Sequence, residues 1–416
     1  MRPAGLPPSW ATTVNYPAGT DDWSGSSTKV DPGTTKVANG FLPGERIAAE
    51  HLNFELNRFA QFVTYLDTIE ARNWTQQVEV DVRTNVSFNA LEYDEANQRF
   101  WLGGTSRSGG DDEAKLFWSL NGIDWAEEGS VPTRPMIGAL QTIQIAPSVS
   151  GILLSWDTTN GKSWFAFRAT NGTWTTSTNQ PADIIATFAI YNDTSTKWEI
   201  FGHRNGSTQP RIWTVTNTDI WVESTLTSAS SHLGLITLAA IKPASSTKIA
   251  INSTGGVWKF NLIAAAWQFT ASPFASTPKG LTWWDAEGVF LVVCTGGEVY
   301  SSDDGASWTL RTTVSGVSFD GCTSGPGGLT AIGGLVVSPC VIDTANGGIQ
   351  QVLAIGWDLG QSWDSVSLPV VDPSLGVGGS RGVQSLVFMD RRLGILRRAG
   401  STSGEGARVT FGMRVQ

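Results

Sequence analysis

The chain has 416 residues and is mildly acidic, with 37 Asp and Glu against 28 Lys and Arg and a formal net charge of −9. This balance, without a basic stripe, does not favour a nucleic-acid partner. No window approaches the roughly 18 uninterrupted apolar residues of a membrane span, so we expect no membrane insertion. With 46 Gly and 19 Trp beside only 5 Tyr, the composition indicates an all-β repeat protein.

Residues 1–44 are predicted to form an arm, whose first 40 residues are rich in Pro, Gly, Thr, Ser and Asp, with isolated apolar anchors at Trp10, Tyr16, Trp23 and Val30. Such a segment cannot bury enough apolar surface to fold alone. We therefore expect an extended arm that lies along another protein and is held there by these anchors.

Residues 45–72 are predicted to form one long helix. Apolar residues recur in it with the 3-4-3-4-3 spacing of a coiled coil, at Ala49, Leu52, Leu56, Phe59, Val63 and Leu66. Two interpretations remain open. The helix packs on the chain's own β domain, or it associates with copies of itself in a parallel bundle, for which a homotrimer is favoured.

A Ser-x-Asp-x-Gly-x-Ser-Trp string, filled by Ser301, Asp303, Gly305, Ser307 and Trp308, is the best copy of a turn repeated along the chain. Asp and Ser side chains bond nearby backbone N–H groups, and Gly tolerates positive φ. We expect a self-locking hairpin, with structural roles for Ser301, Asp303, Gly305 and Trp308.

A second near-complete copy assigns the same structural roles to Asp358, Gly360 and Trp363. The Trp residues that end these turns recur every 41 to 55 residues, at Trp74, Trp125, Trp174, Trp221, Trp267, Trp308 and Trp363. Such a period with strands is typical of propeller blades, each with three strands, a turn and a Trp-led fourth strand. In the second repeat the turn at 160–164 competes with Trp174 for the alignment.

The two ends of the repeat region complement each other. At one end, residues 74–82 form a Trp-led strand that is not preceded by the three strands of a repeat. At the other end are three strands without a Trp-led fourth strand, at 383–388, 393–397 and 409–415. Pairing them leaves no open edge. The sequence therefore predicts an all-β, seven-bladed β-propeller over residues 73–416, preceded by the arm and the helix.

Two resemblances add expectations about function. The turn resembles the Asp-box (BNR) repeat of sialidase-like β-propellers. The strings at 16–19, 22–25, 29–30, 40–45, 49–53 and 56–57 resemble the N-terminal region of bacteriophage and prophage tail-fibre or virion structural proteins. The second resemblance implies a virion protein, made in the bacterial host cytoplasm, that attaches through Trp10, Trp23 and Phe41. Its implied partners are other virion proteins and a host-surface glycan or receptor.

Catalytic residues are not expected. Sialidases use three Arg on a substrate carboxylate, a Tyr nucleophile and an acidic group. The available arginines match no such blade positions; they are Arg134, Arg168, Arg204, Arg211 and Arg311. The main alternative is an Asp-box glycoside hydrolase acting on host-surface glycan. A host-side assembly propeller is disfavoured by the phage-like arm.

We also predict no cofactor and no metal site. The three histidines share no ligand spacing. The acidic run 111–113 is expected to be a solvated loop, with a weak divalent-cation site as the alternative. Cys294, Cys322 and Cys340 are expected as buried free thiols, with a Cys322–Cys340 disulfide as the alternative.

Overall fold

The chain divides into two compact units, residues 1–73 and 74–416. The structure is a computed structural model that describes residues 76–80, 86–94, 97–108, 111–122, 124–129, 139–145, 151–157, 161–168, 173–192, 195–216, 218–226, 234–245, 247–319, 328–343, 349–367, 383–389, 392–397 and 407–414. The expected arm (1–44) and helix (45–72) lie outside these residues. No helix within the described ranges is long and apolar enough to cross a membrane.

The described residues form thirty β-strands in seven sheets. Sheets 1 to 3 contain β2 (Val86–Asp94), β3 (Arg99–Ser108), β4 (Asp111–Ser119) and β5 (Ala126–Glu127); β6 (Ala139–Ile145), β7 (Gly151–Asp157), β8 (Lys162–Arg168) and β9 (Trp174–Thr176); and β10 (Ile184–Asn192), β11 (Lys197–Arg204), β12 (Arg211–Val215) and β13 (Trp221–Glu223).

Sheets 4 to 7 contain β14 (Thr225–Leu226), β15 (Ile236–Ile241), β16 (Lys248–Asn252), β17 (Val257–Asn261) and β18 (Ala266–Thr270); β19 (Pro278–Trp284), β20 (Val289–Cys294), β21 (Glu298–Ser302) and β22 (Thr309–Thr313); β23 (Val317–Phe319), β24 (Thr330–Ile332), β25 (Leu335–Asp343), β26 (Ile349–Trp357) and β27 (Ser362–Ser367); and β28 (Val383–Met389), β29 (Arg392–Arg397), β30 (Ala407–Arg414) and β1 (Gln76–Val80).

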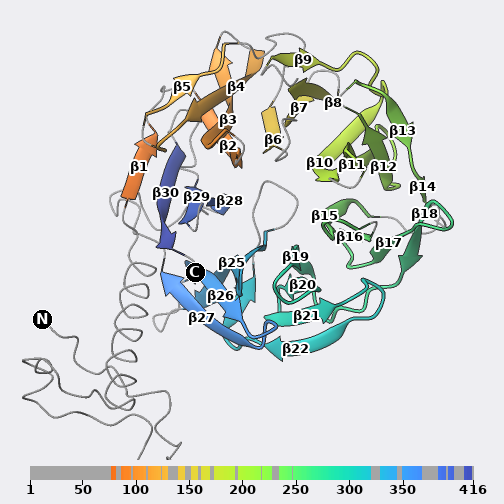
Figure 1. The fold of residues 1–416 in the computed structure, drawn as a ribbon, viewed down its shortest axis with the longest axis vertical. Helices are drawn as coiled ribbons and strands as arrows, with labels where there is room; N and C mark the ends of the chain where they lie inside the picture. The colour runs from red at the N-terminus through yellow and green to blue at the C-terminus, as the bar shows by residue number, and fades with distance from the viewer. Residues whose placement is uncertain are drawn as a thin grey trace, which may run out of the picture. The chain divides into compact units, whose positions relative to one another are not determined.

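The sheets are arranged around a common centre (Figure 1), with the early strands of each sheet nearest that centre and the last strand at the periphery. Successive strands within a sheet pair antiparallel. One exception is β14, which adds to β18 in parallel through Thr225↔Ala266 and Leu226↔Trp267. The second unit is therefore an all-β propeller, as predicted from the Trp-led repeat.

The first and last strands of this unit belong to one sheet. β1 pairs antiparallel with β30, from Gln76↔Phe411 to Val80↔Ala407. This is the pairing that the sequence predicts for the strand at 74–82. It gives sheet 7 its fourth strand, so the edge of β30 is covered.

The Trp residues mark the outer strands as expected. Trp174, Trp221 and Trp363 lie within the first two residues of β9, β13 and β27, and Trp308 directly precedes β22. In sheet 2 the competing turn at 160–164 instead joins β7 to β8. The alignment on Trp174 is therefore the right one.

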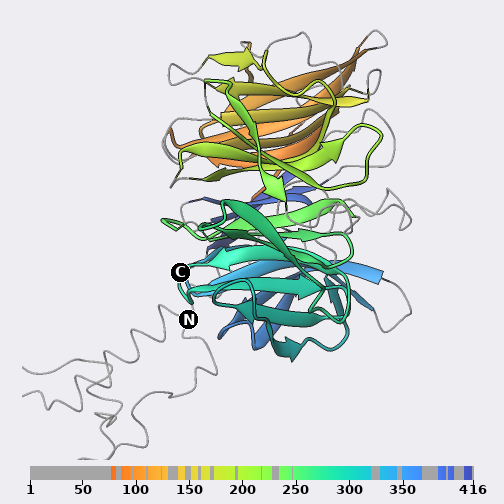
Figure 2. The ribbon, with the colours of Figure 1, turned by 90° about the vertical axis from the view of Figure 1, so that its right-hand side faces the viewer.

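Apolar cores fill the seams between neighbouring sheets, which lie face against face (Figure 2). One core joins Phe165 of sheet 2 to Trp213 of sheet 3, and another joins Phe290 of sheet 5 to Ile249 of sheet 4. Six Trp side chains are almost wholly buried, namely Trp101, Trp198, Trp213, Trp258, Trp267 and Trp284. The indole rings thus hold sheet to sheet, as large apolar side chains do.

A β-bulge recurs in the innermost strand of six sheets. Each bulge leaves out one residue from the pairing with the second strand, and that residue is always polar: Asn89, Gln141, Thr187, Thr237, Lys279 and Gln384. In sheet 6 the innermost strand is interrupted, because β23 and β24 pair with the same strand β25 on either side of residues 320–329. Bulges increase local twist, so their repetition bends each sheet at the same level.

Thr187 shows what a bulge residue does between sheets. Its hydroxyl lies 3.0 Å from the Phe201 carbonyl of its own sheet and 3.1 Å from the Ile236 carbonyl of sheet 4. We expect Thr187→Val to lower the free energy of unfolding by about 1 to 2 kcal/mol, because these carbonyls lose their donor. Urea unfolding monitored by Trp fluorescence measures this loss.

Thr237→Val is the matched control. This hydroxyl belongs to an exposed side chain and lies 3.5 Å from the Ile251 carbonyl. Its loss should change stability by less than about 0.5 kcal/mol. Equal effects of the two substitutions would show that the contact of Thr187 with sheet 4 does not contribute to the free energy of unfolding.

Candidate functional site

The ring has two chemically different ends. At the hairpin end the third strand of each sheet turns into the fourth; at the loop end the second strand turns into the third. β1 is the fourth strand of sheet 7, so Gln76 begins it at the hairpin end beside the last residues of β30. β1 therefore begins at the hairpin end of sheet 7.

The hairpin turn of sheet 5 is locked one residue later than predicted. The Gly305 N–H donates to Ser302 Oγ at 2.8 Å, and the N–H groups of Ala306 and Ser307 donate to Asp304 Oδ1 at 2.8 and 3.1 Å. Burial opposes ionisation of Asp304, but these hydrogen bonds outweigh it and keep its pKa below the usual range. The lock therefore consists of Ser302 and Asp304.

The predicted pair Ser301 and Asp303 has other surroundings. Ser301 is buried in β21, where its hydroxyl accepts a hydrogen bond from Arg311 Nε at 2.6 Å. Asp303 is exposed on the turn. The prediction failed because two Ser and two Asp are adjacent in the sequence. The turn motif can therefore be aligned on Ser301 and Asp303 or on Ser302 and Asp304, and only the path of the backbone shows which alignment is right.

With this shift, the turns of sheets 1 and 5 have equal length. Gly122 N–H donates to Ser119 Oγ at 2.9 Å, and Asp124 N–H donates to Asn121 Oδ1 at 2.9 Å. Ser119 and Asn121 thus correspond to Ser302 and Asp304. The common pattern is Ser-x-Asp/Asn-Gly-x-x-Trp, one residue shorter than the string read from the sequence.

Gly305 and Trp308 pack against neighbouring structure. Gly305 has φ of 74°, and a Cβ there would lie 2.1 Å from Ile249 Cδ1 of sheet 4. A side chain is therefore excluded both by the backbone conformation and by the adjoining sheet. The ring of Trp308 lies 5.3 Å from that of Phe274, edge to face.

The turn of sheet 6 is held by its backbone. Gly360 N–H donates to the Trp357 carbonyl at 3.1 Å, and Trp363 Nε1 donates to the Gly360 carbonyl at 2.7 Å. Asp358 and Leu359 both have φ of 55°. Asp358 therefore does not occupy the locking position predicted for it, because Leu359 stands where sheet 5 has Asp304.

We expect Asp304→Ala to lower the free energy of unfolding by about 1 to 2 kcal/mol, since two turn N–H groups lose their acceptor. Asp303→Ala, its exposed neighbour, should change stability by less than about 0.5 kcal/mol. Thermal unfolding of both variants measures the difference. A larger loss of stability for Asp303→Ala would show that Asp303, as predicted from the sequence, locks the turn.

Asp219 is a structural residue that the sequence did not reveal. Its Oδ2 accepts the N–H groups of Thr178 and Asn179 at 2.7 and 2.9 Å, and its Oδ1 accepts Trp221 Nε1 at 2.7 Å. Partial burial opposes its ionisation, but hydrogen bonds, including one from Ser177, hold its pKa below the usual range. Asp219 thus ties sheet 3 to the segment leaving sheet 2, across forty residues of sequence.

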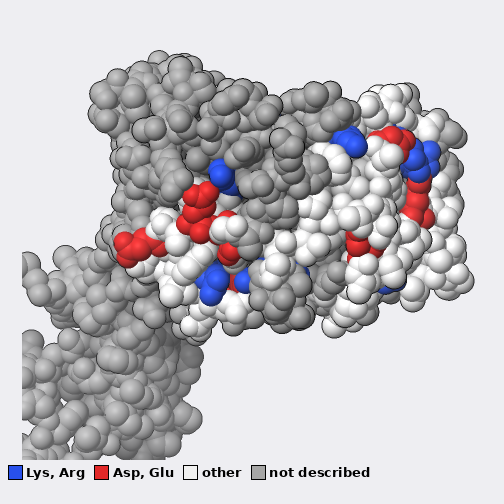
Figure 3. All heavy atoms as spheres, turned by 90° about the horizontal axis from the view of Figure 1, so that it is seen from above, with Lys and Arg blue, Asp and Glu red and all other residues white. Residues whose placement is uncertain are grey.

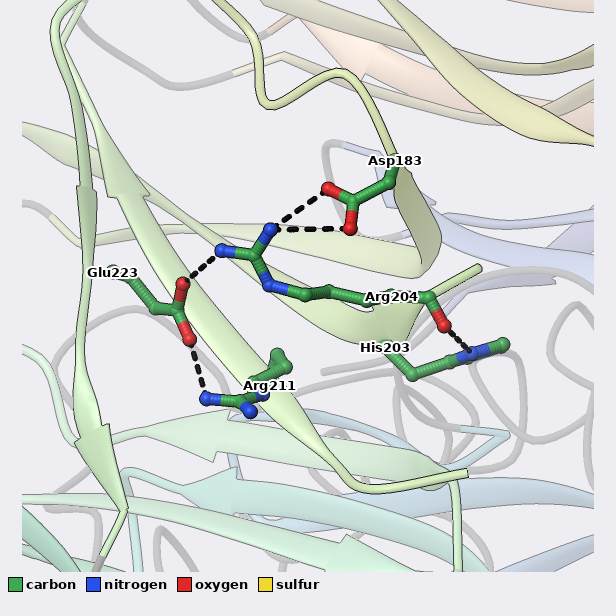
Figure 4. A network of polar contacts seen from close by, with 5 residues as sticks. All are labelled: Asp183, His203, Arg204, Arg211 and Glu223. Atoms are coloured by element: carbon green, nitrogen blue, oxygen red, sulfur yellow. Dashed lines mark hydrogen bonds and ion pairs between the residues drawn. The ribbon is translucent and has the colours of Figure 1, made fainter. Parts of the chain in front are cut away.

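At the loop end, four charged residues of sheet 3 form one network (Figure 4). Arg204 Nη1 donates to both carboxylate oxygens of Asp183 at 2.8 and 3.1 Å, and its Nη2 donates to Glu223 at 2.6 Å. Arg211 Nη1 donates to the other Glu223 oxygen at 2.6 Å. His203 turns away, its Nδ1 3.0 Å from the Arg204 carbonyl.

This network is partly exposed and balanced in charge, with two cations and two anions. The side chains of Arg204 and Asp183 are 39% and 42% exposed. The hydrogen bonds that Arg204 donates to Glu223 and then to Asp183 raise the pKa of Arg204. The network is a rigid polar surface at the loop end, because both guanidinium groups are held by carboxylates.

The candidate arginines do not converge. Arg204 and Arg211 meet on Glu223, whereas Arg168 is buried against Asp94 at 3.1 Å and Arg311 bonds Ser301. Arg134 lies outside the described residues. The three-arginine carboxylate site of a sialidase is therefore not assembled by Arg168, Arg204, Arg211 and Arg311.

The part of the chain that the structure describes contains possible metal ligands as well as charged residues of both signs. No group of three His, Cys, Asp or Glu side chains there is placed to hold a metal ion. On the face in Figure 3, acidic and basic residues lie in small mixed groups. The acidic run 111–113, expected as a loop, lies in β4, because β3 and β4 pair as far as Ser108↔Asp111.

Two of the three cysteines can be placed. Cys294 and Cys340 are buried free thiols, and burial raises the pKa of each to about 12. The free state of Cys340 excludes the alternative disulfide with Cys322. The anchors Trp10, Trp23 and Phe41 lie outside the described residues, so their contacts stay predictions.

Comparison with known proteins is consistent with a β-propeller and goes no further. No family model matches the sequence, and no curated protein matches it. A solved structure titled "YCF48 bound to D1 peptide" resembles the chain with a TM-score of 0.53 and 12% identity, covering 83% of this chain and 96% of that one. At this identity the likeness shows the fold alone, and a fold does not specify a function.

Proposed function

We propose that the chain is a structural and adhesion component of a tailed-phage virion. Residues 1–44 attach it to other virion proteins, and the propeller is displayed for binding a host-surface glycan or receptor. The observation that carries this proposal is the division at Asn73 and Trp74. The phage-like strings all fall in the first unit, and the repeat falls in the second.

We further propose that the seven sheets are the blades of one closed seven-bladed ring. Three features support it: the β1–β30 pairing, the chain of apolar seams, and the bulge at one level in six innermost strands. A closed ring leaves no open sheet face. It therefore suits a display domain exposed outside a cell.

Binding is favoured over catalysis. Arg204 and Arg211 are already neutralised by Asp183 and Glu223, so they are not free to hold a substrate carboxylate. The similar propeller in the YCF48 structure is titled as a peptide complex, which supports the use of this fold as a binding scaffold. Turnover on a glycan panel would favour the Asp-box glycoside hydrolase instead.

Virion attachment is tested with full-length Trp23→Ala and Phe41→Ala variants. Each should lower the number of copies per purified particle about tenfold or more, because aromatic anchors dominate interface energies. Immunoblotting of particles measures this, with Thr208→Ala at the loop end as the control. Absence of the unaltered chain from particles would overturn the proposed function.

Self-association is tested separately by light scattering of the full-length chain. A homotrimer should have about three times the protomer mass of 44.5 kDa. A monodisperse monomer would remove the oligomer from the proposal and leave the helix at 45–72 to pack on the chain's own propeller.

A further inference from the structure

The seam between sheets 1 and 2 contains both arginine and tryptophan side chains. The two sheets are neighbours in the ring (Figure 1), and they share an apolar core that includes Trp101 and Trp174. Successive strands run antiparallel, so the turn from β2 to β3 lies at the hairpin end together with the turn from β8 to β9. Asp94 ends β2, Arg99 begins β3, Arg168 ends β8 and Trp174 begins β9. All four residues are therefore at the hairpin end of this seam.

Both guanidinium groups lie over tryptophan rings. The guanidinium carbon of Arg168 is 4.9 Å from the centre of the Trp101 ring. The guanidinium carbon of Arg99 is 5.8 Å from the centre of the Trp101 ring and 4.8 Å from that of Trp118. The rings of Trp101 and Trp174 are 6.2 Å apart, edge to face. Trp101 therefore contacts the other three, and we call Arg99, Trp101, Arg168 and Trp174 the seam cluster.

Each member of the seam cluster has a buried N–H group to which the chain offers no acceptor. These groups are Nε of Arg99 and Arg168 and Nε1 of Trp101 and Trp174. The residues Trp101, Trp174 and Arg168 are only 0%, 3% and 8% exposed. An unpaired buried donor loses its hydrogen bonds to water without replacement. The seam cluster therefore needs hydrogen-bond acceptors.

The charges of the seam are unbalanced in the same sense. Arg168 is paired with Asp94 at 3.1 Å, whereas the half-buried Arg99 has no ion pair with any described residue. Glu92 is directly opposite Trp101 in the pairing of β2 with β3, so it lies on this face of sheet 1. Burial raises the pKa of Glu92 to about 8, and it is therefore mostly protonated at neutral pH. One cation is left without a counter-charge, which is unfavourable for a group removed from water.

We propose that the hairpin end of the seam between sheets 1 and 2 binds a small monovalent anion, of which chloride is the type, through the N–H groups of the seam cluster. An anion supplies acceptors and negative charge together, so it meets both needs. A small anion is required because Trp101, Trp174 and Arg168 are closely packed. The bound anion ties sheet 1 to sheet 2. This site goes beyond the proposed function and does not rest on it.

Trp213 provides a matched control for the seam cluster. Its ring is in the core between sheets 2 and 3, it is 1% exposed, and its Nε1 also has no acceptor from the chain. The nearby charges differ, because Arg211 is held by Glu223 and the network of sheet 3 is balanced. We therefore expect no anion at Trp213.

Thermal unfolding of the full-length chain tests the site, in sodium chloride mixed with sodium gluconate at constant ionic strength. We expect Tm to rise by about 2 to 4 °C between 1 and 100 mM chloride, because a ligand that binds only the folded chain stabilises it by mass action. Arg99→Met and Trp101→Phe should each abolish this rise, whatever they do to Tm itself. Trp213→Phe should retain it. No rise in the parent, or equal rises in all four proteins, would overturn the proposal.

A second measurement does not depend on the variants. Crystals of the parent protein soaked in sodium bromide should show an anomalous scattering peak beside Arg99 Nε and Trp101 Nε1, because bromide has the charge of chloride and nearly its size. Bromide found only at other places on the protein would overturn the proposal. Neither result bears on attachment to the virion, so the proposed function is tested separately.

Discussion

Lys248→Met is expected to lower the free energy of unfolding by about 3 to 5 kcal/mol, because it leaves a buried carboxylate without its cation. Lys248 Nζ bonds Glu199 Oε1 across the seam between sheets 3 and 4, and their side chains are 10% and 1% exposed. Asn192 Nδ2 also donates to Glu199 Oε1, at 3.1 Å. Urea unfolding of the full chain measures the loss.

Two further variants separate this pair from surface charge. Glu199→Gln combined with Lys248→Met removes both charges and should recover most of the lost stability, to within about 2 kcal/mol of the parent. Lys259→Met breaks the exposed contact with Asp304 at 3.5 Å and should cost less than about 0.5 kcal/mol. A Lys248→Met variant as stable as the parent would contradict the buried ion pair.

The second large effect is a loss of stability with rising pH caused by Glu92. Burial raises the pKa of this carboxyl from 4.5 to about 8; the Tyr93 N–H opposes the shift and nearby Asp94 adds to it. Between these two pH values the unfolded chain ionises Glu92 while the folded chain keeps it protonated. Stability contributed by Glu92 therefore falls as pH rises through this window.

We expect Glu92→Gln to be more stable than the parent at pH 8 by about 2 to 4 kcal/mol, less than the full linkage value because Glu92 keeps some exposed surface. At pH 4.5 the two proteins should be nearly equal. Urea unfolding at half-unit pH steps measures the difference between them. A difference independent of pH would show that Glu92 ionises normally in the fold.

Much of the architecture could be read from local pattern. The runs at 383–388, 393–397 and 409–415 predicted β28, β29 and β30, and the Trp spacing predicted which strand comes last in each repeat. These features can be predicted from the sequence because strand formation and turn conformation depend on residues that are close together in the chain. The pairing of residues 74–82 with the C-terminal strands followed from the need to cover an open edge.

The bulges had a sequence signal that was missed. Each left-out residue is polar, such as Thr187 in Ala-Thr-Phe-Ala or Thr237 in Ile-Thr-Leu-Ala, although most of these first strands contain other polar residues as well. One polar residue in a strand is ordinary by itself. Only its recurrence at the same step of six repeats distinguishes it.

The sequence by itself determined the class of fold, the repeat and the positions of most strands, because these depend on short-range periodicity. Tertiary structure alone decided that Ser302 and Asp304, rather than Ser301 and Asp303, lock the sheet 5 hairpin. It also brought together Asp219 with residues 177–179, and Glu199 with Lys248. The contacts of Asp219 and of Glu199 join residues forty or more positions apart, so they depend on which sheets become neighbours and how these sheets face each other.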